Sequence, residues 1–121
     1  MHPYSFPALP NDASPKNIVG GFADLPALYG VMSKRGDGGK KIWITELGAP
    51  TGNGPMAVTE EAQAAIIGSS LAQASRLPYV GPVFVHALRD AGTDAFDSEQ
   101  NYGLLRADFS RKPSFAVVQG S

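Results

Sequence analysis

Residues 42–48, IWITELG, are the part of the sequence that is most informative about the fold. β-Branched and aromatic side chains fill the first four positions, which predicts a short, buried strand. A glycine-rich run at residues 36–39 precedes this strand, and the stretch GAPTGNGP, residues 48–55, follows it and cannot form regular structure. The strand is therefore entered through a short connection and left through a long loop.

Helical patterns lie on both sides of the predicted strand. Before it, apolar residues recur at intervals of three and four, which predicts an amphipathic helix over residues 24–35 with Pro26 in its first turn. After it, Thr59 offers an N-cap oxygen and two glutamates follow at the positive end of the helix dipole. We therefore expect a second helix over residues 60–76.

The remaining segments complete an alternating order of strands and helices. A mostly apolar run at residues 80–88 predicts a second strand, and the apolar stretch after Pro113 predicts a terminal helix. Residues 1–17 hold four of the ten prolines, which predicts a loop. Strands that alternate with helices indicate βα units on a parallel sheet, so the expected fold class is α/β, in a single domain of residues 1–121.

The connection lengths indicate which edge of the sheet carries function. Both strand-to-helix loops are long, whereas the helix-to-strand connections are short. In parallel sheets, working residues lie where the carboxyl ends of strands pass into loops, and Glu46 is expected at such an end. The position alone allows two interpretations, a solvated carboxylate at the end of a strand or a catalytic carboxylate.

Composition excludes several function classes. Ten basic and eleven acidic residues give a net charge of -1, which is not the footprint of a nucleic-acid-binding protein. The absence of Cys removes disulfides, thiol catalysis and Cys-ligated zinc. The acidic residues after the second strand lack the spacing of a calcium loop, so we expect no metal and no cofactor.

Two further expectations concern location. No apolar run approaches the roughly 18 residues that a membrane span needs, and the proline-rich start does not have the pattern of a signal peptide. We therefore expect a soluble chain without membrane contact, in a compartment that the sequence leaves open.

Four motifs, in the correct order, resemble segments of the clan A glycoside hydrolases, in particular family thirty-nine and cellulase-like barrels. The strand IWITELG resembles the W-x-T/S-E-x-G ending of their seventh barrel strand. The others are HPY at residues 2–4, similar to the end of the sixth strand, FVHALRD at 84–90, similar to the eighth, and NYGLL at 101–105 with KPSF at 112–115, similar to the closing segment. The resemblance implies a partial (β/α)₈ TIM barrel, roughly its last two to three βα units.

The same resemblance implies retaining glycosidase chemistry. Such enzymes use one carboxylate as nucleophile and a second, about 5–5.5 Å away, as acid and then base. Glu46 matches the nucleophile, and Tyr4 and His2 would orient it, because hydrogen bonds from a hydroxyl or an imidazole favour the ionised carboxylate. His86 stands where relatives usually show an aromatic residue. It either binds a sugar hydroxyl or packs as a core histidine.

The second carboxylate is missing from the sequence. In the resembling family it follows an Asn, and the chain contains no Asn-Glu dipeptide. A complete barrel needs roughly 250 residues. We therefore expect a fragment of an O-glycosidase that is inactive alone, whose partners are a carbohydrate substrate and either the missing amino-terminal half-barrel or a second copy paired through strand edges. The alternative is a non-catalytic carbohydrate-binding or interaction module derived from such a barrel.

Overall fold

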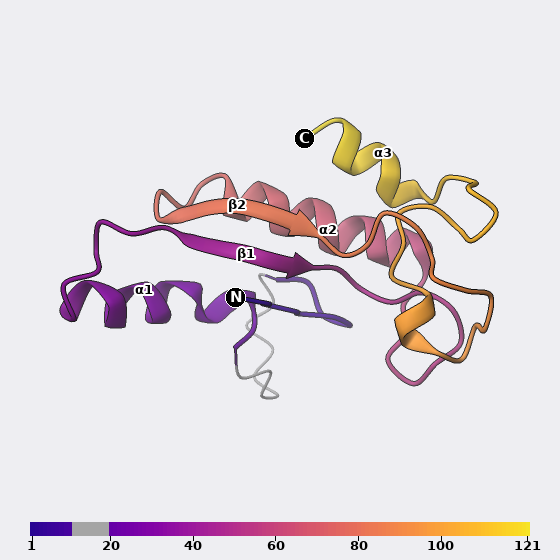
Figure 1. The fold of residues 1–121 in the computed structure, drawn as a ribbon, viewed down its shortest axis with the longest axis horizontal. Coiled ribbons are helices and arrows are strands. Elements are labelled where there is room, and N and C mark those ends of the chain that lie inside the picture. Colours follow the sequence, from indigo (N-terminus) through magenta and orange to yellow (C-terminus); the bar gives the residue numbers. More distant parts are fainter. Residues whose placement is uncertain (11–19) are drawn as a thin grey trace.

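The computed structural model describes residues 1–10 and 20–121. Along the chain lie the 3₁₀ turn η1 (Phe22–Asp24), α1 (Leu25–Lys34), β1 (Ile42–Leu47), α2 (Glu60–Ala74), β2 (Val80–Val85), the 3₁₀ turn η2 (Ser98–Gln100) and α3 (Pro113–Gln119) (Figure 1). The helices and strands follow the order that the sequence predicts. Residues 11–17 of the expected loop lie outside the described residues, as do residues 18 and 19.

The strands β1 and β2 form a two-stranded parallel sheet, in which Ile42 aligns with Val80 and Leu47 with Val85. The prediction of βα units on a parallel sheet is therefore confirmed, with α2 as the crossover that parallel strands require. β2 ends at Val85 rather than at residue 88. The reason is that the next residues bond to a later part of the chain, where the amide of Ala87 donates to the carbonyl of Tyr102 at 3.1 Å. We call residues 101–105 the returning segment.

The other edge of β1 is bonded to the first residue of the chain. The terminal ammonium of Met1 donates to the carbonyl of Trp43 at 2.9 Å, and the amide of Thr45 donates to the carbonyl of Met1 at 3.0 Å. A residue in a neighbouring parallel strand makes this pair of bonds. The contact therefore brings residues 2–4 to the carboxyl end of β1.

The main apolar core covers only one face of the sheet. It joins α1, β1 and the end of α2, and its buried members are Phe22, Leu25, Ile42, Ile44, Leu47 and Ala74. On the opposite face Trp43 and Phe84 remain 54% and 51% exposed, with ring centroids 6.5 Å apart. We call this face, with Trp43 and Phe84, the open face of the sheet.

A buried amide connects α2 to the loops beyond the strands. The side chain of Gln63 is fully buried and donates to the carbonyl of Ala49 at 2.9 Å. Its oxygen accepts from the hydroxyl of Ser114 at 2.7 Å, at the start of α3. Because both polar ends of the amide are satisfied, it can be buried without the cost of an unpaired group. The two long loops are thus held to the same end of α2.

Candidate active site

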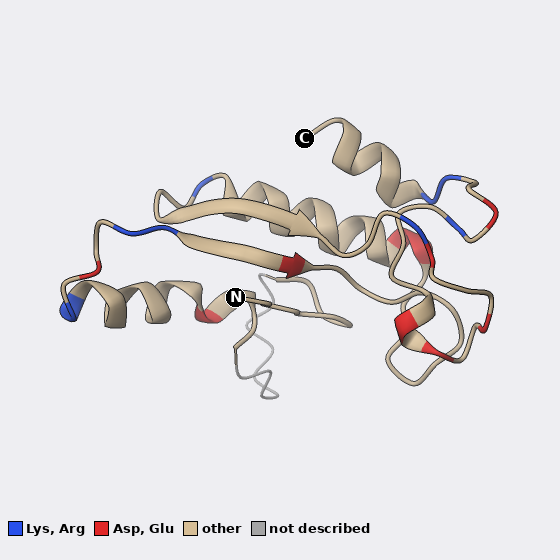
Figure 2. Ribbon diagram, viewed as in Figure 1, with Lys and Arg blue, Asp and Glu red and all other residues tan. Residues whose placement is uncertain are grey.

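Glu46 lies near the carboxyl end of β1, and its side chain is 39% exposed. It is the only charged residue within β1 and β2. Most other charged residues lie in loops and near helix ends (Figure 2). The strand continues to Leu47, one residue further than the sequence predicts. Its register with β2 is irregular between Ile44 and Leu47, which are both buried although they are three residues apart. Simple alternation of buried and exposed side chains therefore does not hold at this end of the strand.

The structure brings His2, Tyr4 and Glu46 together. The hydroxyl of Tyr4 donates to Oε2 of Glu46 at 2.9 Å, and Nδ1 of His2 lies 3.1 Å from the same oxygen. Among the described residues, no hydrogen bond reaches the other carboxylate oxygen, Oε1. One edge of the carboxylate is thus held by two side chains that the contact between Met1 and β1 places beside it.

Two tyrosines near Glu46 keep their protons to unusually high pH. Burial raises the pKa of Tyr4 above its ordinary value, and the hydrogen bond to Glu46 raises it further. The pKa of Tyr102 is also raised, first by burial and then by the negative charges of Glu99 and Glu46. Tyr4 is therefore a neutral hydrogen-bond donor to the carboxylate, not a competing anion.

Tyr102 is the centre of an aromatic cluster beside the carboxylate. It is 8% exposed, and its ring centroid lies 6.0 Å from that of Tyr4, 6.1 Å from Phe6 and 5.1 Å from His86. His86 is half-buried and packs against Tyr102 in this cluster, so both interpretations of it, as a core histidine and as a sugar-binding residue, stay open. No hydrogen bond joins His86 to Glu46, and its contact with sugar remains a prediction.

Gly48 explains why a glycine follows the strand end. A Cβ atom at this position would lie 2.3 Å from the carbonyl oxygen of His86 and 3.3 Å from Cδ1 of Tyr102. The end of β1, the residue after β2 and the Tyr102 ring are thus in close contact. Any side chain at Gly48 would separate them and displace the surroundings of Glu46.

The sequence does not reveal a buried ion pair beside this cluster. Arg89 and Asp90 do not form the surface pair that their adjacency allows. Asp90 is 6% exposed and its Oδ1 lies 2.8 Å from Nζ of Lys112, whereas Arg89 is exposed and lies over the ring of Phe109. Only the KPSF motif singled out Lys112, and nothing in the spacing pairs it with Asp90, 22 residues earlier.

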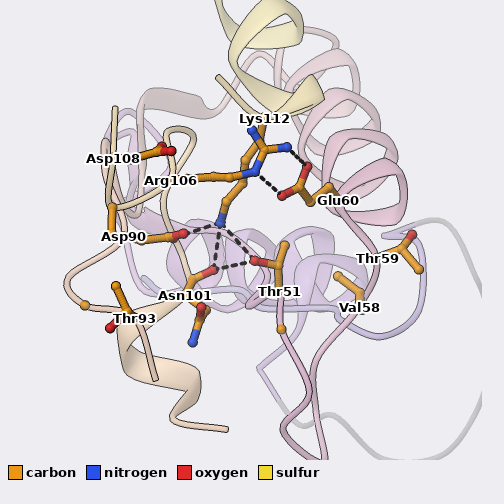
Figure 3. A pocket seen from close by; sticks show the side chains of 13 residues that line it. Thr51, Val58, Thr59, Glu60, Asp90, Thr93, Asn101, Arg106, Asp108 and Lys112 are labelled. Carbon is orange, nitrogen blue, oxygen red and sulfur yellow. Dashed lines mark hydrogen bonds and ion pairs between the residues drawn. The ribbon is translucent and has the colours of Figure 1, made fainter. Parts of the chain in front are cut away.

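A cavity of about 510 Å³ lies between the two long loops and the start of α2 (Figure 3). Asp90, Lys112 and Thr51 line it, together with the ion pair in which Arg106 donates to both oxygens of Glu60, at 2.8 and 2.5 Å. Glu46 is not part of its lining. The cavity is therefore separate from the carboxylate site. Four of its charged side chains form two ion pairs, and the fifth, Asp108, accepts from the amide and the hydroxyl of Ser110.

The described residues contain neither a cluster of metal-binding side chains nor a helix that could span a membrane. Across residues 1–10 and 20–121, no group of three or more histidines and carboxylates could hold a metal ion. Within the same residues, no helix is both long and apolar enough to cross a membrane.

No protein-family model matches the chain, and no curated protein matches its sequence. Solved structures do. A family 39 glycoside hydrolase from the gut symbiont Bacteroides cellulosilyticus WH2 matches 98% of this chain over 25% of its own length, with 26% identity and a TM-score of 0.73.

Two further glycosidases resemble the chain. A β-glucuronidase from Bifidobacterium dentium matches 81% of the chain over 17% of its own, with 21% identity and a TM-score of 0.59. A GH2 β-galacturonidase from Eisenbergiella tayi matches 80% over 19%, with 22% identity and a TM-score of 0.62. The chain therefore spans a quarter or less of the length of each structure. Its mixed fold, with a small parallel sheet, matches a portion of a glycosidase domain.

Proposed function

We propose that this chain is the carboxy-terminal portion of a retaining O-glycosidase barrel, close to family 39 of the glycoside hydrolases, and that Glu46 is its nucleophile. The observation that carries the proposal is the pair of contacts from Tyr4 and His2, at 2.9 and 3.1 Å, to one oxygen of a carboxylate at the carboxyl end of a parallel strand. In α/β barrels this end of the strands carries the active site.

The contacts suit a carboxylate that attacks carbon. Hydrogen bonds to Oε2 fix the orientation of the Glu46 carboxylate. Oε1 is then the oxygen that bonds to the anomeric carbon, while the bond from that carbon to the leaving oxygen breaks and a protonated acid supplies the leaving group with a proton. Water hydrolyses the resulting ester. The acid/base carboxylate and the sugar-binding residues opposite Glu46 would come from the rest of the barrel.

The open face of the sheet supports the proposal that further strands of a barrel pack against this chain. Trp43 and Phe84 are large apolar side chains that the chain leaves half-exposed, and β2 has no further strand beside it among the described residues. Unpaired strand edges bind other strands. We infer that the remaining strands of the barrel cover this face, and that a second copy of the chain replaces them when they are absent.

A second candidate function is a carbohydrate-binding module without catalysis. It rests on the absence of an Asn-Glu strand end from the sequence. Such a module would bind sugar beside Glu46 but could not form or hydrolyse a glycosyl ester. Covalent labelling distinguishes the two functions.

The test is labelling with a fluorinated glycoside that carries an activated leaving group. Such a reagent needs little proton donation, and the fluorine slows hydrolysis of the ester. In the complete enzyme the label should fall on Glu46. Glu46→Gln should abolish labelling and lower turnover by several orders of magnitude with little change in stability, because the amide preserves the shape of the side chain. Glu61→Gln, at an exposed glutamate on α2, is the matched control.

The 121-residue chain alone should show no appreciable turnover, since loss of general acid catalysis costs typically 10²–10⁴-fold. Equal and rapid cleavage of substrates with good and poor leaving groups would reveal a second carboxylate within the chain. If Glu46→Gln instead unfolds the protein while its folded fraction stays active, Glu46 is a structural residue. The proposed function would then lose its nucleophile.

A further inference from the structure

Lys112 lies at the base of the cavity in Figure 3, with its side chain 1% exposed. Its ammonium group donates to Oδ1 of Asp90 at 2.8 Å, to Oγ1 of Thr51 at 2.9 Å and to the carbonyl of Asn101 at 3.3 Å. These are three acceptors for the three protons of an ammonium group. They come from the loop after β1, the loop after β2 and the returning segment, so one buried charge joins all three.

The returning segment is held on both sides of Tyr102. The carbonyl before it, that of Asn101, also accepts from the amide and the hydroxyl of Thr51, at 3.0 and 3.1 Å. The amide after it, that of Gly103, donates to Oδ1 of Asp90 at 2.8 Å. Both flanking residues are thus bound to partners of Lys112, which leaves the Tyr102 backbone little freedom to move.

Tyr102 in turn borders the candidate active site. Its ring packs 6.0 Å from that of Tyr4, the donor to Glu46, and 5.1 Å from that of His86. It would also lie within 3.3 Å of any Cβ at Gly48, two residues after Glu46. A shift of residues 101–103 would therefore move the ring that limits where Tyr4 can lie.

We propose that Lys112 is a positioning residue for the Glu46 site, acting through Thr51, Asp90 and the segment 101–103 to fix Tyr102 beneath Tyr4. The effect of this positioning on catalysis rests on the proposed function, in which Glu46 is the nucleophile. A buried charge is costly unless it is fully paired, and an apolar group would fill the same volume at lower cost. Unlike an apolar group, the ammonium group of Lys112 makes three directional hydrogen bonds, and these specify one arrangement of the three segments.

The mildest test changes Thr51, which is 5% exposed. Thr51→Val keeps the shape and removes the hydroxyl, whereas Thr51→Ser keeps the hydroxyl. In the complete enzyme, Thr51→Val should slow the covalent labelling of Glu46 by about 10- to 100-fold, the usual effect of a small misplacement of reacting groups. In the 121-residue chain it should weaken the nuclear Overhauser effects between the ring protons of Tyr102 and Tyr4. Thr51→Ser should restore both signals.

Lys112→Met alone leaves Asp90 buried and unpaired, which can prevent folding. It is therefore combined with Asp90→Asn, and Lys40→Met, which removes an exposed ion pair with Asp37, is the matched control. The double variant should lose the same ring contacts and label slowly, while Lys40→Met behaves as wild type.

Two results would overturn the inference or separate it from the proposed function. If Thr51→Val and the double variant both fold and keep wild-type labelling and ring contacts, Lys112 does not position the site. If wild-type enzyme is not labelled at Glu46, the proposed function fails. The ring contacts in the 121-residue chain then still decide whether Lys112 fixes Tyr102.

Discussion

At the scale of single residues, Tyr4 couples the stability of the chain to alkaline pH. In an unfolded chain a tyrosine titrates near pH 10. In the folded chain the pKa of Tyr4 is raised by burial and by its bond to Glu46, so the folded state retains the proton to higher pH. The resulting stabilisation is complete below about pH 10 and is lost as pH rises through the folded value.

Tyr4→Phe should therefore reduce the loss of stability as pH rises above about 10, because a group that cannot ionise contributes no such dependence. Part of the loss will remain, since the pKa of Tyr102 is also raised. Urea unfolding across this pH range gives the slopes to be compared. An unchanged slope in Tyr4→Phe would show that the pKa of Tyr4 does not differ between the folded and the unfolded chain.

The sequence could predict that His2, Tyr4 and Glu46 lie close together, because their motifs resemble the ends of two neighbouring strands in clan A glycoside hydrolases. It could not predict the pair of Asp90 and Lys112. Charged residues are rarely fully buried, so a single lysine before a proline reads as a solvated side chain. The pairing depends on the path of the returning segment, which has no periodic signal.

At the scale of elements, α2 begins where a side-chain cap predicts. The hydroxyl of Thr59 accepts from the amide of Ala62 at 3.1 Å, which satisfies one of the free amides in the first turn. Thr59→Ala should lower the free energy of unfolding by about 1 kcal/mol, measured by urea denaturation. Thr93→Ala, at an exposed threonine in the loop after β2, should change it little. Equal effects of the two substitutions would mean that the cap contributes nothing.

Helices were easier to predict than strand ends, for a physical reason. Periodicity, caps and prolines are local signals, and they locate α1, α2 and α3 to within a few residues. The irregular register near Leu47 and the early end of β2 result from pairing with segments distant in sequence. Local patterns do not contain such tertiary contacts.

At the scale of the whole molecule, one face of the sheet is covered by the apolar core and the other is the open face. We expect it to associate at micromolar concentration, because the open face and the free edge of β2 gain from being covered. Light scattering tests this expectation, and a monodisperse species of 12.7 kDa would contradict both it and the half-barrel interpretation. Replacing Trp43 and Phe84 by threonine should weaken association, whereas Phe109→Thr, at an exposed loop aromatic, should not.

The open face also carries a natural optical reporter. The chain contains one tryptophan, Trp43, and it is half-exposed on this face. Indole emission shifts to shorter wavelength when water is excluded, so the colour of the fluorescence should follow coverage of the sheet without any added label. Titration with a polypeptide that supplies the remaining strands of the proposed barrel should then report assembly directly, and dilution of the isolated chain should return the emission to that of a hydrated indole.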